Sequence, residues 1–222
     1  MTTVGYIYKV GMQLAMCHGP IDKITKIKVS DSIAWEGIST GGSIVIDEPT
    51  LFGGSSREGG ITGTVNFASG GPAQTANSYL VSILGGLVPA FRRVSCLILE
   101  QVGIGMNPYI KPWAIFCQRI HTAQEGATQW NNSYSQIDVT VDDSAGLPVT
   151  VAAMNPAHII REALTNTLWG MGYNSGDLDN GSFTAAALAL YNEGMGMCIL
   201  WDTQKTIEDF VRLVLQHIGA DI

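Results

Sequence analysis

The sequence predicts an α+β fold, in which a β-rich domain at residues 1-150 precedes a helix-strand-helix unit at residues 151-222. Two observations predict this division. Before residue 150, short segments rich in Val, Ile and aromatic residues alternate with Gly, Pro, Asn and Asp, as strands alternate with turns. After residue 151, apolar residues recur at the spacing of amphipathic helices.

The first domain contains seven segments that we expect to be strands of antiparallel or mixed sheets, open or closed into a barrel. They are 4-15, 24-29, 43-46, 61-67, 94-102, 113-120 and 137-141. One helix interrupts them at 74-84, where Ala76, Leu80, Ile83 and Leu84 lie at helical spacing before a pair of glycines.

The second unit contains three predicted helices and one strand. Asn155 caps the first helix, Pro156 occupies its first position, and its apolar stripe ends at Gly170. Ser182 is the expected cap of the second helix, which is followed by a strand at 197-201 and a third helix at 204-218. Such apolar faces need a sheet to cover them, so we expect this unit to pack on the first domain or to continue in a longer protein.

Composition restricts the function classes. The chain has 222 residues, of which 46% are apolar, and this excludes disorder driven by charge excess. It carries 12 basic and 19 acidic residues, 31 in all, where an average chain of this length would carry roughly 55. The net charge of −7 disfavours nonspecific binding of nucleic acid. The longest apolar run, 80-91, is too short and too interrupted for a membrane-spanning helix, and the N-terminus lacks the pattern of a secretory signal, so we expect folding in a cytoplasm.

No pattern of residues indicates a metal, a cofactor or a catalytic centre. The four cysteines are far apart in the sequence, so buried reduced thiols are expected, with one disulfide as the alternative. His158 and Glu162 share a helix face, where a salt-bridging or solvent-facing role is expected. Asp142 and Asp143 are expected to form a turn. We therefore expect no enzymatic activity.

Two alternatives remain open. An enzyme that cleaves cell-wall polymers would need a pair of carboxylates, and the 19 acidic residues include no convincing pair. A carbohydrate-binding module could use Trp35, Trp113 or Trp130 as a platform for sugars, whereas Trp169 and Trp201 are expected to lie in the core.

Two segments are candidates for contacts between subunits. The segment 51-60 has two pairs of glycines around an Arg-Glu pair, which suggests an exposed loop with an anchored apolar root. The segment 107-113 combines two prolines with Tyr and Trp, which are frequent in binding hot spots. An ordinary hairpin loop and, for Trp113, core packing are the alternatives. The candidate contact residues are Leu51, Phe52, Arg57, Glu58, Tyr109, Lys111 and Trp113.

Four motifs occur in an order that resembles the N-terminal part of the tail-tip hub proteins of long-tailed bacteriophages, also called tip attachment or central tail fibre proteins. They are Cys17-His18-Gly19-Pro20, Leu51-Phe52-Gly53-Gly54 with Arg57-Glu58-Gly59-Gly60, Asn107-Pro108-Tyr109 with Lys111-Pro112-Trp113, and 155-172 with Asn155-Pro156-Ala157-His158 and Trp169-Gly170-Met171-Gly172. The resemblance extends over nearly the whole chain.

The resemblance implies a structural virion protein that is assembled in the host cytoplasm and lies at the phage tail tip. Three copies would form a hub that closes the distal end of the tail tube, attaches the host-recognition fibre and takes part in DNA ejection. The implied partners are the distal tail protein, other tail-tip proteins and the tape measure protein, with DNA passing through without specific binding. Members of this family are usually longer, with further hub domains and a receptor-reading fibre region after the point at which this sequence ends.

Overall fold

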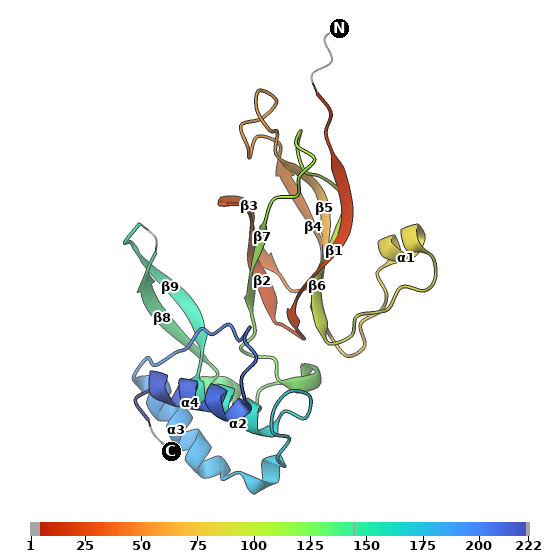
Figure 1. Cartoon of the computed structure of the whole chain (residues 1–222). Helices are drawn as coiled ribbons and strands as arrows, with labels where there is room; N and C mark the ends of the chain where they lie inside the picture. The colour runs from red at the N-terminus through yellow and green to blue at the C-terminus, as the bar shows by residue number, and fades with distance from the viewer. Residues whose placement is uncertain (1–4, 144, 221–222) are drawn as a thin grey trace. The chain divides into compact units, whose positions relative to one another are not determined.

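The computed structural model describes residues 5-143 and 145-220, and it has an α+β fold built from antiparallel strand pairs (Figure 1). The chain divides into two compact units, Met1–Arg119 and Ile120–Ile222. The expected domain boundary at residue 150 falls inside strand β9 (Pro148–Met154), which pairs with β8 (Gln136–Asp142). This hairpin belongs to the second unit, although its alternating sequence resembles that of the strands before it.

The first unit contains two antiparallel sheets. The four-stranded sheet has the order β1 (Lys9–His18), β6 (Val94–Gly103), β5 (Ile61–Ala68) and β4 (Gly42–Glu48). The three-stranded sheet has the order β3 (Ser32–Ser39), β2 (Lys23–Val29) and β7 (Trp113–Gln118). Strand β3 was not among the predicted strands.

The core of the first unit contains residues from both sheets, and the irregular register of β2 is part of it. Ile24, Ile27 and Val29 are all fully buried, although Ile24 and Ile27 would point to opposite faces of a regular strand. The pairing of β2 with both of its neighbours shifts between Ile24 and Lys26. This β-bulge returns Ile27 to the core face.

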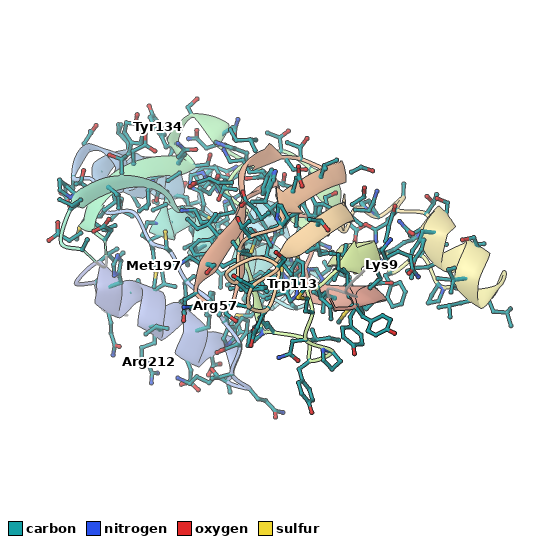
Figure 2. All side chains as sticks on the ribbon, turned by 90° about the horizontal axis from the view of Figure 1, so that it is seen from above. Lys9, Arg57, Trp113, Tyr134, Met197 and Arg212 are labelled. Carbon is teal, nitrogen blue, oxygen red and sulfur yellow. The ribbon has the colours of Figure 1, made fainter. Side chains whose placement is uncertain are left out.

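Helix α1 (Ser78–Leu84) lies within the long connection between β5 and β6 and stands out from the strands (Figures 1 and 2). It begins later than the predicted helix because the Asn77 side chain caps it by accepting a hydrogen bond from the Leu80 amide at 3.1 Å. Gln74 lies outside the helix, where its amide group joins the two ends of the connection. It accepts a bond from the Gly70 amide and donates to the Ala90 carbonyl, both at 2.9 Å.

The second unit combines the β8–β9 hairpin with three further α-helices. These are α2 (Pro156–Thr165), α3 (Asn180–Asn192) and α4 (Ile207–His217), and α2 packs on both of the others. The strand expected at 197-201 was wrong: only Met197 pairs, through a single bridge with Met154. The hairpin turn contains Asp143, whose carboxylate accepts hydrogen bonds from the amides of Ala145 and Leu147 at 2.8 and 2.9 Å, in agreement with the turn role predicted for it.

The caps of the helices explain where they begin. The Asn155 side chain accepts a bond from the Ala157 amide at 3.0 Å, and Pro156 follows it, as predicted. Asp179, and not Ser182, caps α3: its carboxylate accepts bonds from the Gly181 amide and the Ser182 hydroxyl. A carboxylate at this position accepts a hydrogen bond from a free amide, and its negative charge also interacts favourably with the positive end of the helix dipole.

Within residues 5-143 and 145-220, no helix has the length and apolar character that crossing a bilayer requires.

Candidate functional site

The loop 51-60, here called the contact loop, joins β4 to β5 and is held by backbone hydrogen bonds. The Phe52 amide donates to the Gly59 carbonyl at 2.9 Å, and the Met106 amide donates to the Glu58 carbonyl at 2.9 Å. Leu51 and Phe52 are partly buried against the core of the first unit, so the predicted apolar root of the loop is present. Arg57 is exposed. The rearrangement of this loop on contact with another subunit stays a prediction.

Lys111 connects the two segments that the sequence singles out. Its Nζ lies 2.6 Å from Oε2 of Glu58 and 4.7 Å from the centre of the Phe52 ring. The hydrogen bond from Lys111, together with its positive charge, lowers the pKa of Glu58 below the ordinary value for a glutamate. Three of the candidate residues therefore form one cluster, which holds the contact loop against the segment 107-113.

The remaining candidates differ in exposure. Tyr109 is 77% exposed and presents its ring to solvent. Trp113 is partly buried and packs against the core of the first unit, which is the alternative that the sequence left open for it. Arg57 and Tyr109 are therefore the candidates best placed to contact a partner, and Leu51 and Trp113 mainly support the fold.

A second surface was missed in the sequence analysis. The segment 69-91, here called the arm, carries three large aliphatic side chains in exposed positions: Ile83 is 61% exposed, Leu84 is 69% and Leu87 is 98%. No residue between Ile61 and Phe91 is charged. The signal in the sequence is the apolar run 80-91. Large aliphatic side chains exposed so close together in the chain are typical of a site for protein contact.

The inner side of the arm is attached to the four-stranded sheet. Leu80 is buried in a small cluster with Cys96 and Ile98, and Tyr79 packs beside it. The Tyr79 ring lies against Gly11 of β1, where any larger residue would collide with its hydroxyl group. Next to this contact is an apolar pocket of about 300 Å³, whose lining includes Met12, Leu84, Leu87 and Phe91. The arm is thus anchored on one side and exposed on the other.

The four cysteines of the chain carry free thiols: Cys96 is buried, Cys17 is partly buried, and Cys117 and Cys198 are exposed. A side-chain hydrogen bond with Cys17 lowers the pKa of Cys117 to about 7, whereas the interaction with Cys117 and burial raise the pKa of Cys17. Burial also raises the pKa of Cys96 and of Cys198. Buried reduced thiols were expected, and this was wrong for Cys117 and Cys198, which are exposed.

His158 occupies the core of the second unit, so the solvent-facing role considered for it was wrong. Its side chain is fully buried and stacks on Trp130, with ring centres 4.8 Å apart. Its Nε2 lies 2.7 Å from the Asn131 carbonyl oxygen and donates a hydrogen bond to it. The guanidinium carbon of Arg161 lies over the Trp130 ring, 4.8 Å from its centre. Burial is the main cause that lowers the pKa of His158, and the charge of Arg161 adds to it. These side chains stabilise the packing of the unit.

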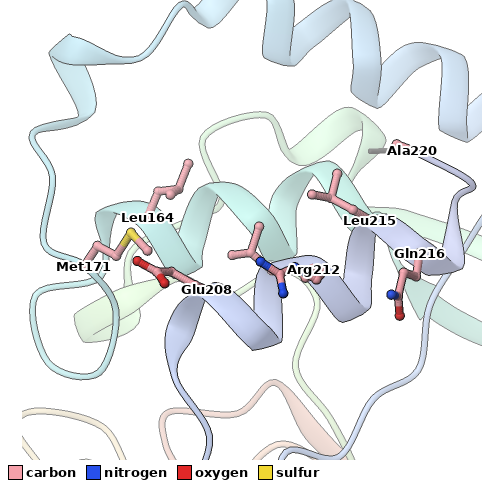
Figure 3. A pocket seen from close by; sticks show the side chains of 8 residues that line it. Leu164, Met171, Glu208, Arg212, Leu215, Gln216 and Ala220 are labelled. Atoms are coloured by element: carbon pink, nitrogen blue, oxygen red, sulfur yellow. The ribbon is translucent and has the colours of Figure 1, made fainter. Parts of the chain in front are cut away.

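A pocket of about 500 Å³ lies between α2 and α4 (Figure 3). Leu164, Met171, Val211 and Leu215 form its apolar wall, and Glu208, Arg212 and Gln216 also line it. Figure 3 shows the α4 side chains along one side and Leu164 with Met171 opposite them. Among the described residues that line this pocket, the charged groups are the Glu208 carboxylate and the Arg212 guanidinium.

The tryptophans considered as platforms for sugars have structural contacts. Trp35 and Trp113 pack against the core of the first unit, and Trp130 stacks on His158. Trp169 and Trp201 pack with Phe210 in the second unit, as expected for core residues. Among the residues that the structure describes, no group of three or more His, Cys, Asp or Glu side chains could hold a metal ion.

No protein-family model matches the chain, and no curated protein matches it either.

Proposed function

We propose that this chain is a structural protein of a long-tailed bacteriophage and forms part of a trimeric hub at the distal tip of the tail. In this role it acts without catalysis. It makes interfaces with copies of itself and with the distal tail, tape measure and other tail-tip proteins, and the assembly closes the tail tube until DNA leaves. The number of copies and the place in the virion come from the order of motifs in the sequence.

The observation that carries the proposal is the exposed, uncharged arm. Leu87 is 98% exposed at the end of an anchored segment with no charged residue between Ile61 and Phe91. A monomer gains nothing from exposing three large aliphatic side chains in this way, whereas an interface buries them favourably, at about 25 cal/mol per Å². The contact loop supports the same role, since Arg57 and Tyr109 are exposed beside a fixed cluster.

The test replaces Leu87 by Asp in the phage that encodes this chain. The side chain has almost no contacts within the protein, so we expect the isolated variant to fold normally, as judged by circular dichroism. Because a charge at an apolar contact is costly, the yield of complete tails should fall about tenfold or more.

Ile38 provides the matched control, because it is a large aliphatic residue that is 73% exposed on β3, in the other sheet of the same unit. Ile38→Asp should reduce the yield of tails much less. Normal tail yield and normal infectivity of the Leu87→Asp phage would show that the arm makes no essential contact, and the proposed role would lose its main support.

A further inference from the structure

Arg161 is a buried cation of the second unit that pairs with no carboxylate among the described residues. It belongs to α2, and only 5% of its surface is exposed. Its guanidinium carbon lies 4.8 Å from the centre of the Trp130 ring and 5.4 Å from that of Phe183. A buried charge without a countercharge is costly, and two ring contacts offset only part of this cost.

Two N–H groups of this contact need an acceptor. Nη1 of Arg161 and Nε1 of Trp130 are both buried, and neither has a hydrogen-bond partner among the residues that the structure describes. Trp130 also stacks on His158, so contacts with more than one side chain fix the position of its ring. Buried donors rarely remain without an acceptor in folded proteins. We call Arg161 Nη1 and Trp130 Nε1 the donor pair, and its acceptor has to come from outside the described residues.

This acceptor also has to balance the charge of Arg161, because a guanidinium stays protonated in proteins. A water molecule accepts hydrogen bonds, but it brings no charge, and its own O–H groups then need acceptors. An oxyanion of the phosphate or sulfate type brings several acceptor oxygens together with a negative charge. Its hydrogen bond with a guanidinium is charge-assisted and therefore stronger than a bond between neutral groups.

We propose that Arg161 and Trp130 form a binding site for a small inorganic oxyanion of the phosphate or sulfate type. Arg161 supplies the countercharge and one donor, and the indole of Trp130 supplies a second, neutral donor. The bound ion connects α2 to the segment before β8, so it stabilises the second unit. The inference rests on two buried donors in direct contact and is independent of the proposed role in a phage tail.

The experiment titrates inorganic phosphate into the full chain near neutral pH, at an ionic strength held constant with sodium chloride. Nuclear magnetic resonance follows the indole N–H signal of each tryptophan in the chain labelled with nitrogen-15. The Trp130 signal should shift and reach saturation at one ion per chain, because its N–H gains an acceptor. Trp35 lies in the first unit and is the internal control, so its signal should show no saturable shift.

Two variants test the role of the charge. Arg161→Gln keeps an N–H donor but removes the positive charge, so it should weaken phosphate binding at least about tenfold. Arg212→Gln is the matched control, because Arg212 is exposed on α4 of the same unit, and it should leave the affinity unchanged within about twofold. Circular dichroism shows whether each variant is folded.

Two results would overturn the proposal. One is a Trp130 signal of the wild type that does not respond to phosphate or that shifts without saturation, since ordered water would then satisfy the donor pair. The other is a folded Arg161→Gln chain that binds phosphate as tightly as the wild type. If Arg161→Gln does not fold, the titration of the wild type decides the question by itself.

Discussion

At the scale of single residues, His158 shows how burial turns a reactive side chain into a structural one. Its Nε2 donates to the Asn131 carbonyl, and its Nδ1 has no hydrogen-bond partner among the described residues. A proton on Nδ1 would place a second charge next to Arg161 in a buried position, which lowers the pKa of His158. The imidazole is therefore neutral in the folded protein at neutral pH.

This neutral state predicts the pH dependence of stability. In the unfolded chain His158 takes up a proton as the pH falls through its ordinary value of 6.5, but in the folded chain it does so only at lower pH. The unfolded state therefore binds more protons in this window, and the free energy of unfolding decreases as the pH falls below 6.5. Urea unfolding at about pH 7.5 and about pH 5.5 measures the decrease.

His158→Gln isolates the contribution of this residue, because glutamine offers an N–H donor but does not titrate. The variant should lose less stability than the wild type between the two pH values. His217→Gln serves as the control, since His217 is exposed on α4, and it should retain the full decrease. An identical decrease in the wild type and in His158→Gln would show that the buried imidazole is not the cause.

At the scale of elements, the position of the arm depends on the close approach of Tyr79 to Gly11. A Cβ atom on residue 11 would collide with the Tyr79 hydroxyl, so Gly11→Ala should displace the ring and weaken the attachment of α1. Hydrogen exchange of the amides in 78-84 should become roughly tenfold faster, which corresponds to a loss of about 1.4 kcal/mol in local stability.

Gly86→Ala is the matched control, because a Cβ at Gly86 meets no atom within 4 Å. It should leave exchange in 78-84 unchanged. If Gly11→Ala also leaves this exchange unchanged, the Tyr79 contact does not hold the arm.

The elements also show what sequence reasoning could and could not find. Segments with a regular apolar pattern, such as the strands at 61-67 and 94-102, were predicted close to their observed bounds. The start of the helix after Asn155 was also predicted correctly, but α2 ends at Thr165 and not near Gly170. Strand β3 was missed because it follows β2 after only Ser30 and Asp31, without the Gly or Pro that marks a tight turn; Ser30 itself adopts a left-handed φ of 53°. The expected strand at 197-201 fails because only Met197 finds a neighbouring strand.

The candidate site was predictable to a similar degree. Glycine and proline patterns located both exposed segments, and the structure joins them through Lys111 and Glu58. The exposure of Leu87 could not be inferred, since an apolar run gives no information on which side faces solvent.

At the scale of the whole molecule, the low charge and the exposed apolar arm favour the same proposal. With 31 charged residues and a net charge of −7, the chain has little strongly hydrated surface, and burial between subunits is the usual use of such a surface. Most soluble homo-oligomers have closed symmetry, in which every copy buries the same contact surfaces. Three copies would carry a formal charge of 3 × −7 = −21, which disfavours adhesion of DNA that passes through their centre.

The most direct test of the trimeric hub is electron cryomicroscopy of intact tails from the phage that encodes this chain. The account predicts density for three copies around the tail axis at the distal tip, with the arm, residues 69-91, buried in an interface. A different number of copies, or a position away from the tip, would contradict it.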